Sequence, residues 1–171
     1  VSTHGFFFPD PKKNDTEMNT FSEGKEKVYR QSDNPLNRSG LLFSGANNAW
    51  TGKAVPQGLE DGILTAYEVS NMYLPNTRLV VLSACETGLG DIKGSEGVFG
   101  LQRAFKMAGV EYIIMSLWKV PDNETAKFME IFYTRLFSGS TIPDAFSFTQ
   151  KQMKTKYKND PYKWAAFVLV K

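Results

Sequence analysis

The stretch LVVLSACETGLGD, residues 79–91, joins an apolar run to a glycine-rich loop. The apolar part, 79–82, is bounded by turn-forming residues, which is typical of a parallel strand buried on both faces. Cys85, the only cysteine of the chain, lies just beyond it. Functional groups of open parallel sheets collect beyond the carboxyl ends of the strands, so this position favours a chemical role for Cys85. The alternative is a small buried side chain.

Two further apolar runs, 112–115 and 165–170, also predict buried strands. Helical spacing predicts a helix from Ser95 to Gly109, another over 123–137, and a third that starts at Thr141 with an early proline. A short helix over 64–72 precedes the first strand. The order of these elements predicts an α/β fold with a mainly parallel sheet.

The region 9–62 has a different character. It is polar and rich in turn formers, so we expect a loop-rich insertion. Two short β-prone runs flank Gly45 within 39–55 and predict a hairpin or β-arm. Trp50 in this arm is a candidate exposed aromatic for binding. The whole chain, 1–171, is expected to form a single domain.

Composition excludes several classes of protein. The net charge of +2, from 20 basic and 18 acidic residues, is too balanced for a nucleic-acid partner. One cysteine excludes an internal disulfide, and one cysteine with one histidine does not furnish a usual zinc site, so no metal or cofactor is expected. No apolar run reaches the length of a membrane span and no signal-peptide pattern is present, so we expect no membrane partner and a cytoplasmic location.

His4, the only histidine, ends a short β-prone run, as Cys85 does. If the two strands are neighbours, both side chains project into one crevice. An imidazole near a thiol favours the thiolate and can protonate a leaving amine. The backbone N–H groups of Gly5 and Cys85 would then be natural donors to an oxyanion. A satisfied surface histidine is the alternative for His4.

Several motifs together resemble the CHAT domain, a caspase-like, separase-related cysteine peptidase family often joined to TPR repeats. The motifs are STHGFFFPDP, LSACETGLG, EGVFGLQRAF, SLWKVPD and WAAFVLV, and the resemblance covers nearly the whole chain. It implies a caspase-like three-layer sandwich in which His4 and Cys85 are the catalytic dyad, with the oxyanion on the amides of Gly5 and Cys85. It also implies strands before the histidine strand, so the chain looks like the C-terminal, dyad-bearing part of the domain.

Three residues are candidates for substrate binding. Asp122 lies beyond a predicted strand, and the similar separase motif implies a pocket there for a basic side chain at P1, the residue before the cleaved bond. The alternative is that Asp122 caps the helix that follows. Asp91 is a second acidic candidate, unless it structures its own turn. Trp118 is a candidate to line the substrate cleft. The alternative is that it packs in the protein core.

Two functions follow from this sequence. The first is a cysteine endopeptidase acting on a protein substrate, regulated by TPR repeats or another region of the parent chain or a partner. The second is a non-catalytic protein-interaction module that keeps the caspase-like fold. A nucleotide-binding role is disfavoured, because the loop GLGDIKGSEG lacks the lysine and spacing of a P-loop and the dinucleotide fingerprint.

Overall fold

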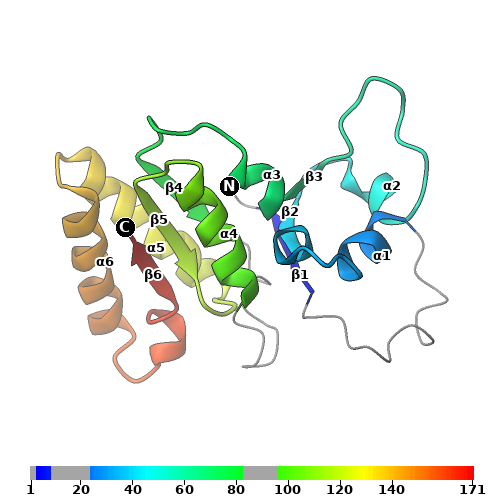
Figure 1. The fold of residues 1–171 in the computed structure, drawn as a ribbon. Coiled ribbons are helices and arrows are strands. Elements are labelled where there is room, and N and C mark those ends of the chain that lie inside the picture. The colour runs from blue at the N-terminus through cyan, green and yellow to red at the C-terminus, as the bar shows by residue number, and fades with distance from the viewer. Residues whose placement is uncertain (1–2, 9–23, 83–95) are drawn as a thin grey trace.

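The computed structural model describes residues 3–8, 24–82 and 96–171, and it combines helices with two small sheets (Figure 1). The elements in chain order are β1 (His4–Phe7), α1 (Lys25–Arg30), η1 (Pro35–Arg38), β2 (Ser39–Leu42), α2 (Ala46–Trp50), β3 (Ile63–Thr65), α3 (Ala66–Ser70), β4 (Leu79–Leu82), α4 (Glu96–Met107), β5 (Tyr112–Ser116), α5 (Asp122–Phe137), α6 (Ile142–Lys156), η3 (Pro161–Lys163) and β6 (Phe167–Val170).

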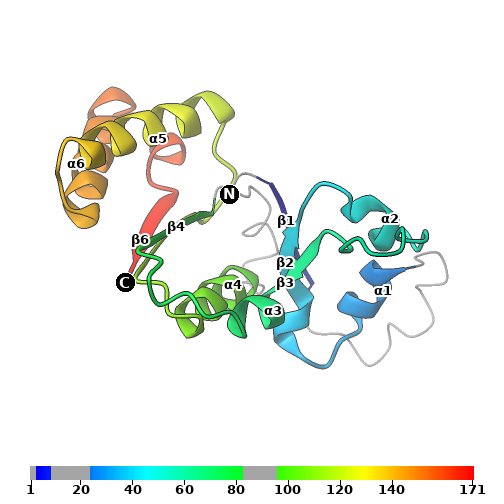
Figure 2. The same ribbon diagram turned by 90° about the horizontal axis from the view of Figure 1, so that it is seen from above.

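The second sheet, with the order β4-β5-β6, has helices on both faces (Figure 2). Side chains of β5 alternate between two cores, as the period of a strand requires. Ile113 and Met115 face a core shared with α3 and α4, whereas Tyr112 and Ile114 face a core shared with α5 and α6. The α/β class is therefore confirmed, with helix, sheet and helix layers around this sheet.

The expectation of a mainly parallel sheet is wrong for the part of the chain that the structure describes. Only β4 and β5 pair in parallel, while β6 runs antiparallel to β5 and both pairs of the first sheet are antiparallel. Helix α4 lies between β4 and β5 and returns the chain to the end where β4 began. Two helices lie between β5 and β6, so the chain re-enters the sheet from the opposite end.

The first sheet, with the order β1-β2-β3, carries an aromatic core on one face. Phe6 and Phe8 are buried there, and Trp50 packs on both rings with centroids 4.9 and 6.0 Å away. The predicted hairpin or β-arm within 39–55 is wrong, since the expected turn after Gly45 forms helix α2 and no strand follows it up to residue 55. Gly45, with a φ of +94°, is the residue before α2, and Ala46 and Ala49 bury one helical face in the aromatic core.

Helices α3 and α4 connect the two sheets (Figure 2). They form a central core with residues of both sheets. Its buried members are Leu41, Ala66, Val69, Leu82, Leu101, Ala104, Phe105, Val110, Ile113 and Met115. Leu41 belongs to β2 and Leu82 is the last residue of β4, so one continuous core holds the first sheet against the end of β4.

Local signals set the helix ends. The predicted helix over 64–72 shortens to α3 because Thr65 ends β3 and forms a capping box with Glu68. Thr141 caps α6 as predicted, accepting a hydrogen bond from the amide of Asp144. Gly109 and Gly139, with φ values of +102° and +97°, follow the ends of α4 and α5.

Candidate active site

His4 opens strand β1 and its side chain is exposed. The expectation that His4 ends a strand is therefore wrong, and the condition that its strand neighbours the one before Cys85 is not met among the described residues. β1 lies in the first sheet and β4 in the second. The reason lies in the residues that follow the histidine. Phe6 and Phe8, two positions apart, both face the aromatic core, so the strand begins at His4 and continues through the phenylalanines.

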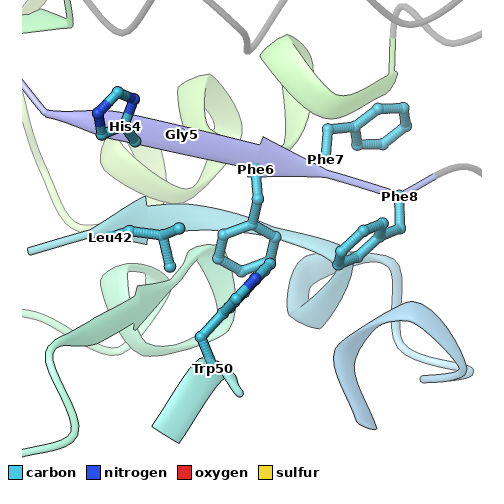
Figure 3. A pocket seen from close by; sticks show the side chains of 7 residues that line it. All are labelled: His4, Gly5, Phe6, Phe7, Phe8, Leu42 and Trp50. Atoms are coloured by element: carbon cyan, nitrogen blue, oxygen red, sulfur yellow. The ribbon is translucent and has the colours of Figure 1, made fainter. Parts of the chain in front are cut away.

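A pocket of about 470 Å³ lies along β1 (Figure 3). All four residues of this strand line it, together with Phe8, which follows the strand, one residue of β2 and one of α2. They are His4, Gly5, Phe6, Phe7, Phe8, Leu42 and Trp50. The pocket thus combines the only imidazole of the chain with an aromatic wall.

The ladder between β1 and β2 shows where the backbone of β1 points. The amide of Phe8 donates to the carbonyl of Arg38 at 2.8 Å, which continues the register of these antiparallel strands. Bonded and non-bonded pairs alternate along such a ladder, so the even-numbered residues of β1 bond to β2. The N–H and C=O groups of Gly5 and Phe7 therefore point away from β2, to the side of β1 that has no partner strand among the described residues.

Cys85 and Asp91 lie outside the described residues. The nearest described residue before them is Leu82, whose side chain is buried in the central core. Leu41 shares that core and lies directly opposite Gly5 in the ladder.

Asp122 is the first residue of α5 and is exposed. The N-cap position belongs to Pro121, and no side chain caps this end of the helix, so the interpretation of Asp122 as the N-cap is wrong by one residue. A carboxylate in the first turn still favours the helix through its dipole. Asp122 is not among the residues that line the His4 pocket.

The side chain of Trp118 packs against other residues of the protein. Its ring stacks on Tyr162 with centroids 5.9 Å apart, and its indole N–H donates to the carbonyl of the same residue at 2.9 Å. It also contacts the core under α5 and α6. These contacts agree with the packing alternative for Trp118, which does not line the His4 pocket.

Trp50 is half-buried, because one side of its ring covers Phe6 and Phe8. The sequence pointed to Trp50 as a binding aromatic but missed the two phenylalanines of the pocket. Their signal was present as an alternation in HGFFFPD, where every second residue of a strand faces one side.

Tyr29 is the residue near this site with a displaced pKa. Burial raises the pKa of its phenol to about 12, and the negative charges of Asp61 and Glu68 act in the same direction. The ring stacks on Phe6 with centroids 5.7 Å apart. The aromatic core therefore lies in a weakly solvated, electronegative environment that disfavours a further anion.

Metal sites and membrane helices were sought in the same ranges, 3–8, 24–82 and 96–171. No cluster of three or more His, Cys, Asp or Glu residues within them could hold a metal ion. None of the helices there combines the length and the apolar character needed to cross a bilayer.

Comparison with known proteins identifies the family. The family model of the CHAT domain matches residues 1–171. The chain belongs to the CHAT domain family. Two curated relatives bear the description Tetratricopeptide repeat protein 28. The human protein is 33% identical and the mouse protein 30% identical, each over 113 residues that make up 66% of this chain.

This CHAT domain chain corresponds to only a small part of those relatives. The matched segment is 4% of the length of each, and both are named for tetratricopeptide repeats. The resemblance to a domain found with TPR repeats is thus confirmed at the level of the family.

Proposed function

We propose that this CHAT domain is a cysteine endopeptidase of the caspase and separase type, with His4 and Cys85 as its dyad. The observation that carries the proposal is the pocket along β1. It brings together an exposed imidazole and a backbone N–H, that of Gly5, which the ladder directs away from β2. A cysteine peptidase needs both groups, one for the leaving amine and one for the oxyanion.

The packing around Gly5 supports a nearby nucleophile. Leu41 faces Gly5 in the ladder and shares a buried core with Leu82, three residues before Cys85. The core therefore holds the end of β4 on the side of the molecule that carries Gly5. No other cysteine occurs in the chain.

The proposed reaction has two steps. The Cys85 thiolate attacks the scissile carbonyl carbon, and the N–H groups of Gly5 and Cys85 stabilise the negative oxygen. The C–N bond breaks as His4 transfers a proton to the leaving amine, which leaves a thioester on Cys85. Water then attacks the thioester, releases the carboxylic acid product and regenerates the thiol. No cofactor takes part.

Two finer assignments belong to the same proposal. Asp122 and Asp91 would give a preference for a basic residue at P1 through their negative charge. A TPR region of the parent chain or of a partner would present the protein substrate, in line with the names of the relatives.

Hydrolysis of a fluorogenic peptide library with basic, apolar and acidic residues at P1 tests the proposal. We expect turnover by the parent chain and its loss in His4→Ala and Cys85→Ala, while Lys27→Ala, a change at an exposed position, retains it. Turnover that survives in Cys85→Ala would refute the mechanism. Absence of turnover, with an intact fold, would favour the non-catalytic interaction module.

A further inference from the structure

A second pocket, of about 590 Å³, lies where β3 leads into α3 (Figure 1). This β3–α3 pocket shares no lining residue with the His4 pocket. Its volume falls in the range of pockets that bind small molecules or side chains. Acidic and apolar residues both line it, among them Glu60, Asp61, Glu68, Phe43, Leu64 and Met72.

Local hydrogen bonds hold two of the carboxylates in place. One oxygen of Glu68 accepts from the amide and the hydroxyl of Thr65, at 2.7 and 2.8 Å, as part of the capping box of α3. One oxygen of Asp61 accepts from the amide of Ile63 at 2.9 Å. Each carboxylate therefore keeps a second oxygen for another donor, because a carboxylate can accept several hydrogen bonds.

The charge of the pocket is negative. No lysine or arginine is among the described residues that line it. Lys25 approaches the second oxygen of Asp61, but the two atoms are 3.9 Å apart and half of the lysine side chain is exposed, so this ion pair is weak. Burial is the main cause of the raised pKa of Tyr29, and the negative charges of Asp61 and Glu68 add to it. The potential of these two carboxylates therefore reaches beyond the pocket.

Two large apolar side chains are exposed at the same place. Phe43 and Met72 are 40% and 38% exposed. The amide of Phe43 donates to the carbonyl of Gly62 at 2.7 Å, which holds this residue beside the acidic part of the lining. An exposed apolar side chain is common by itself. Two of them in one pocket with three carboxylates favour a partner that has both an apolar and a positively charged part.

We propose that the β3–α3 pocket binds a basic amphipathic segment of a partner protein, in which a lysine or arginine faces the carboxylates and a neighbouring apolar side chain covers Phe43 and Met72. Charge complementarity identifies this occupant. An uncharged apolar ligand would take the carboxylates out of water without a partner, which costs free energy. A metal ion is disfavoured, because the described residues contain no group of three acidic, histidine or cysteine side chains able to hold one. The inference uses no residue of the proposed catalytic dyad.

Fluorescence anisotropy tests the binding with fluorescein-labelled hexapeptides that alternate lysine or arginine with leucine or phenylalanine. Two matched sets replace the basic residues by glutamate or the apolar residues by serine. The protein carries Cys85→Ala, so that hydrolysis cannot consume the peptides. We expect the basic amphipathic set to bind at least about tenfold more tightly than either matched set, and to bind less tightly as the salt concentration rises. Equal binding of either matched set, or no saturable binding of any basic amphipathic peptide, would overturn the proposal.

Variants of the chain locate the binding. Glu60→Lys and Phe43→Ala should each weaken it about fivefold or more, because the first reverses a charge and the second removes an apolar wall. Both side chains are exposed, so both variants should stay folded. Asp33→Lys and Phe137→Ala are the matched controls, since both residues are exposed and neither lines the pocket, and they should change binding less than about twofold. Equal losses in variants and controls would overturn the proposal.

Lys25 provides a test in which affinity should rise. Its ammonium competes with an incoming cation for Asp61, so Lys25→Met should tighten peptide binding about twofold or more. Lys27→Met is the control, because it removes the same charge from an exposed position of the same helix. Equal gains in the two variants would contradict the role of Asp61 in the pocket.

Sedimentation velocity distinguishes a partner protein from a second copy of this chain, which carries a basic segment of its own, KQMKTKYKNDPYK at 151–163. A sedimentation coefficient that does not depend on protein concentration, together with peptide binding, would support the proposed partner. Self-association of the parent that is lost in Glu60→Lys would assign the pocket to a second copy and overturn the proposal.

Discussion

Residues around β1 are closely packed, and their side chains have limited contact with solvent. Gly40 shows how closely the first sheet is packed: a Cβ there would lie 2.6 Å from the ring of Phe6 and 2.5 Å from the carbonyl oxygen of Leu64. Tyr29 stacks on the same phenylalanine, and partial burial raises the pKa of its phenol. A charge on that phenol is therefore disfavoured in the folded state.

Tyr29 makes stability depend on alkaline pH. Below about pH 10 its phenol is protonated in both states and contributes nothing. Its folded pKa is raised to about 12, so above pH 10 the unfolded chain releases the proton first and the free energy of unfolding falls as the pH rises. Urea denaturation between about pH 9 and pH 11 should show a smaller loss for Tyr29→Phe than for the parent.

Tyr73→Phe is the control for this titration, because Tyr73 is 89% exposed. It should lose as much stability as the parent over the same pH range. An equal loss in the parent, Tyr29→Phe and Tyr73→Phe would show that Tyr29 does not cause the effect.

Helix α4 and strand β2 approach each other closely at Gly100 and Ser39. A Cβ on Gly100 of α4 would lie 2.6 Å from the hydroxyl oxygen of Ser39 but 3.6 Å from its Cβ. The Ser39 hydroxyl is buried and has no hydrogen-bond partner. Glycine at this position of α4 therefore makes room for one hydroxyl group.

A double-mutant cycle tests this contact. Gly100→Ala alone should lower the free energy of unfolding by about 1–3 kcal/mol through overpacking. In a Ser39→Ala background the clash is absent, and alanine should instead stabilise the helix by up to about 1 kcal/mol. Thermal or urea denaturation of the four proteins gives the coupling energy. Additive effects of the two substitutions would show that the helix and strand do not meet at this point.

The whole molecule is held together by the central core, which packs α3 and α4 against both sheets (Figures 1 and 2). The core under α5 and α6 belongs to the second sheet and the aromatic core to the first. Only the central core contains both Leu41, opposite Gly5, and Leu82, the last residue of β4. Its packing should therefore govern the relative position of His4 and Cys85.

Leu41→Ala and Met153→Ala distinguish this role from stability alone. Both side chains are fully buried, at 1% and 0% exposure, and each substitution should lower the free energy of unfolding by about 2–5 kcal/mol. Under conditions where both variants stay folded, Leu41→Ala should slow peptide hydrolysis strongly and Met153→Ala only slightly. Equal losses of activity at equal stability would refute a special role for the central core.

The sequence predicted the elements with strong local signals. The runs that became β4, β5 and β6 are continuous and apolar, and α6 has a capping threonine and an early proline. The stretch after Gly45 was expected to be a turn between two strands, but it forms helix α2, whose two alanines are buried in the aromatic core. The split into two sheets was also missed. Which strands pair depends on contacts between segments far apart in the sequence, and no local pattern specifies these contacts.

The candidate site was only partly predictable. Residue types identified His4 and Gly5, and the motif resemblance assigned their roles. The aromatic pocket and the outward direction of the Gly5 amide depend on the register between β1 and β2, which pairs residues more than 30 positions apart. No local pattern in the sequence specifies that register.

The most direct test of the central claim, that His4 and Cys85 form one site, is the rate at which iodoacetamide alkylates Cys85 at neutral pH. An ordinary thiol is only a few per cent thiolate at pH 7, so pairing with His4 should raise the rate roughly tenfold or more above that of His4→Ala. Lys27→Ala should behave as the parent does. Equal alkylation rates in the parent and His4→Ala would contradict the dyad.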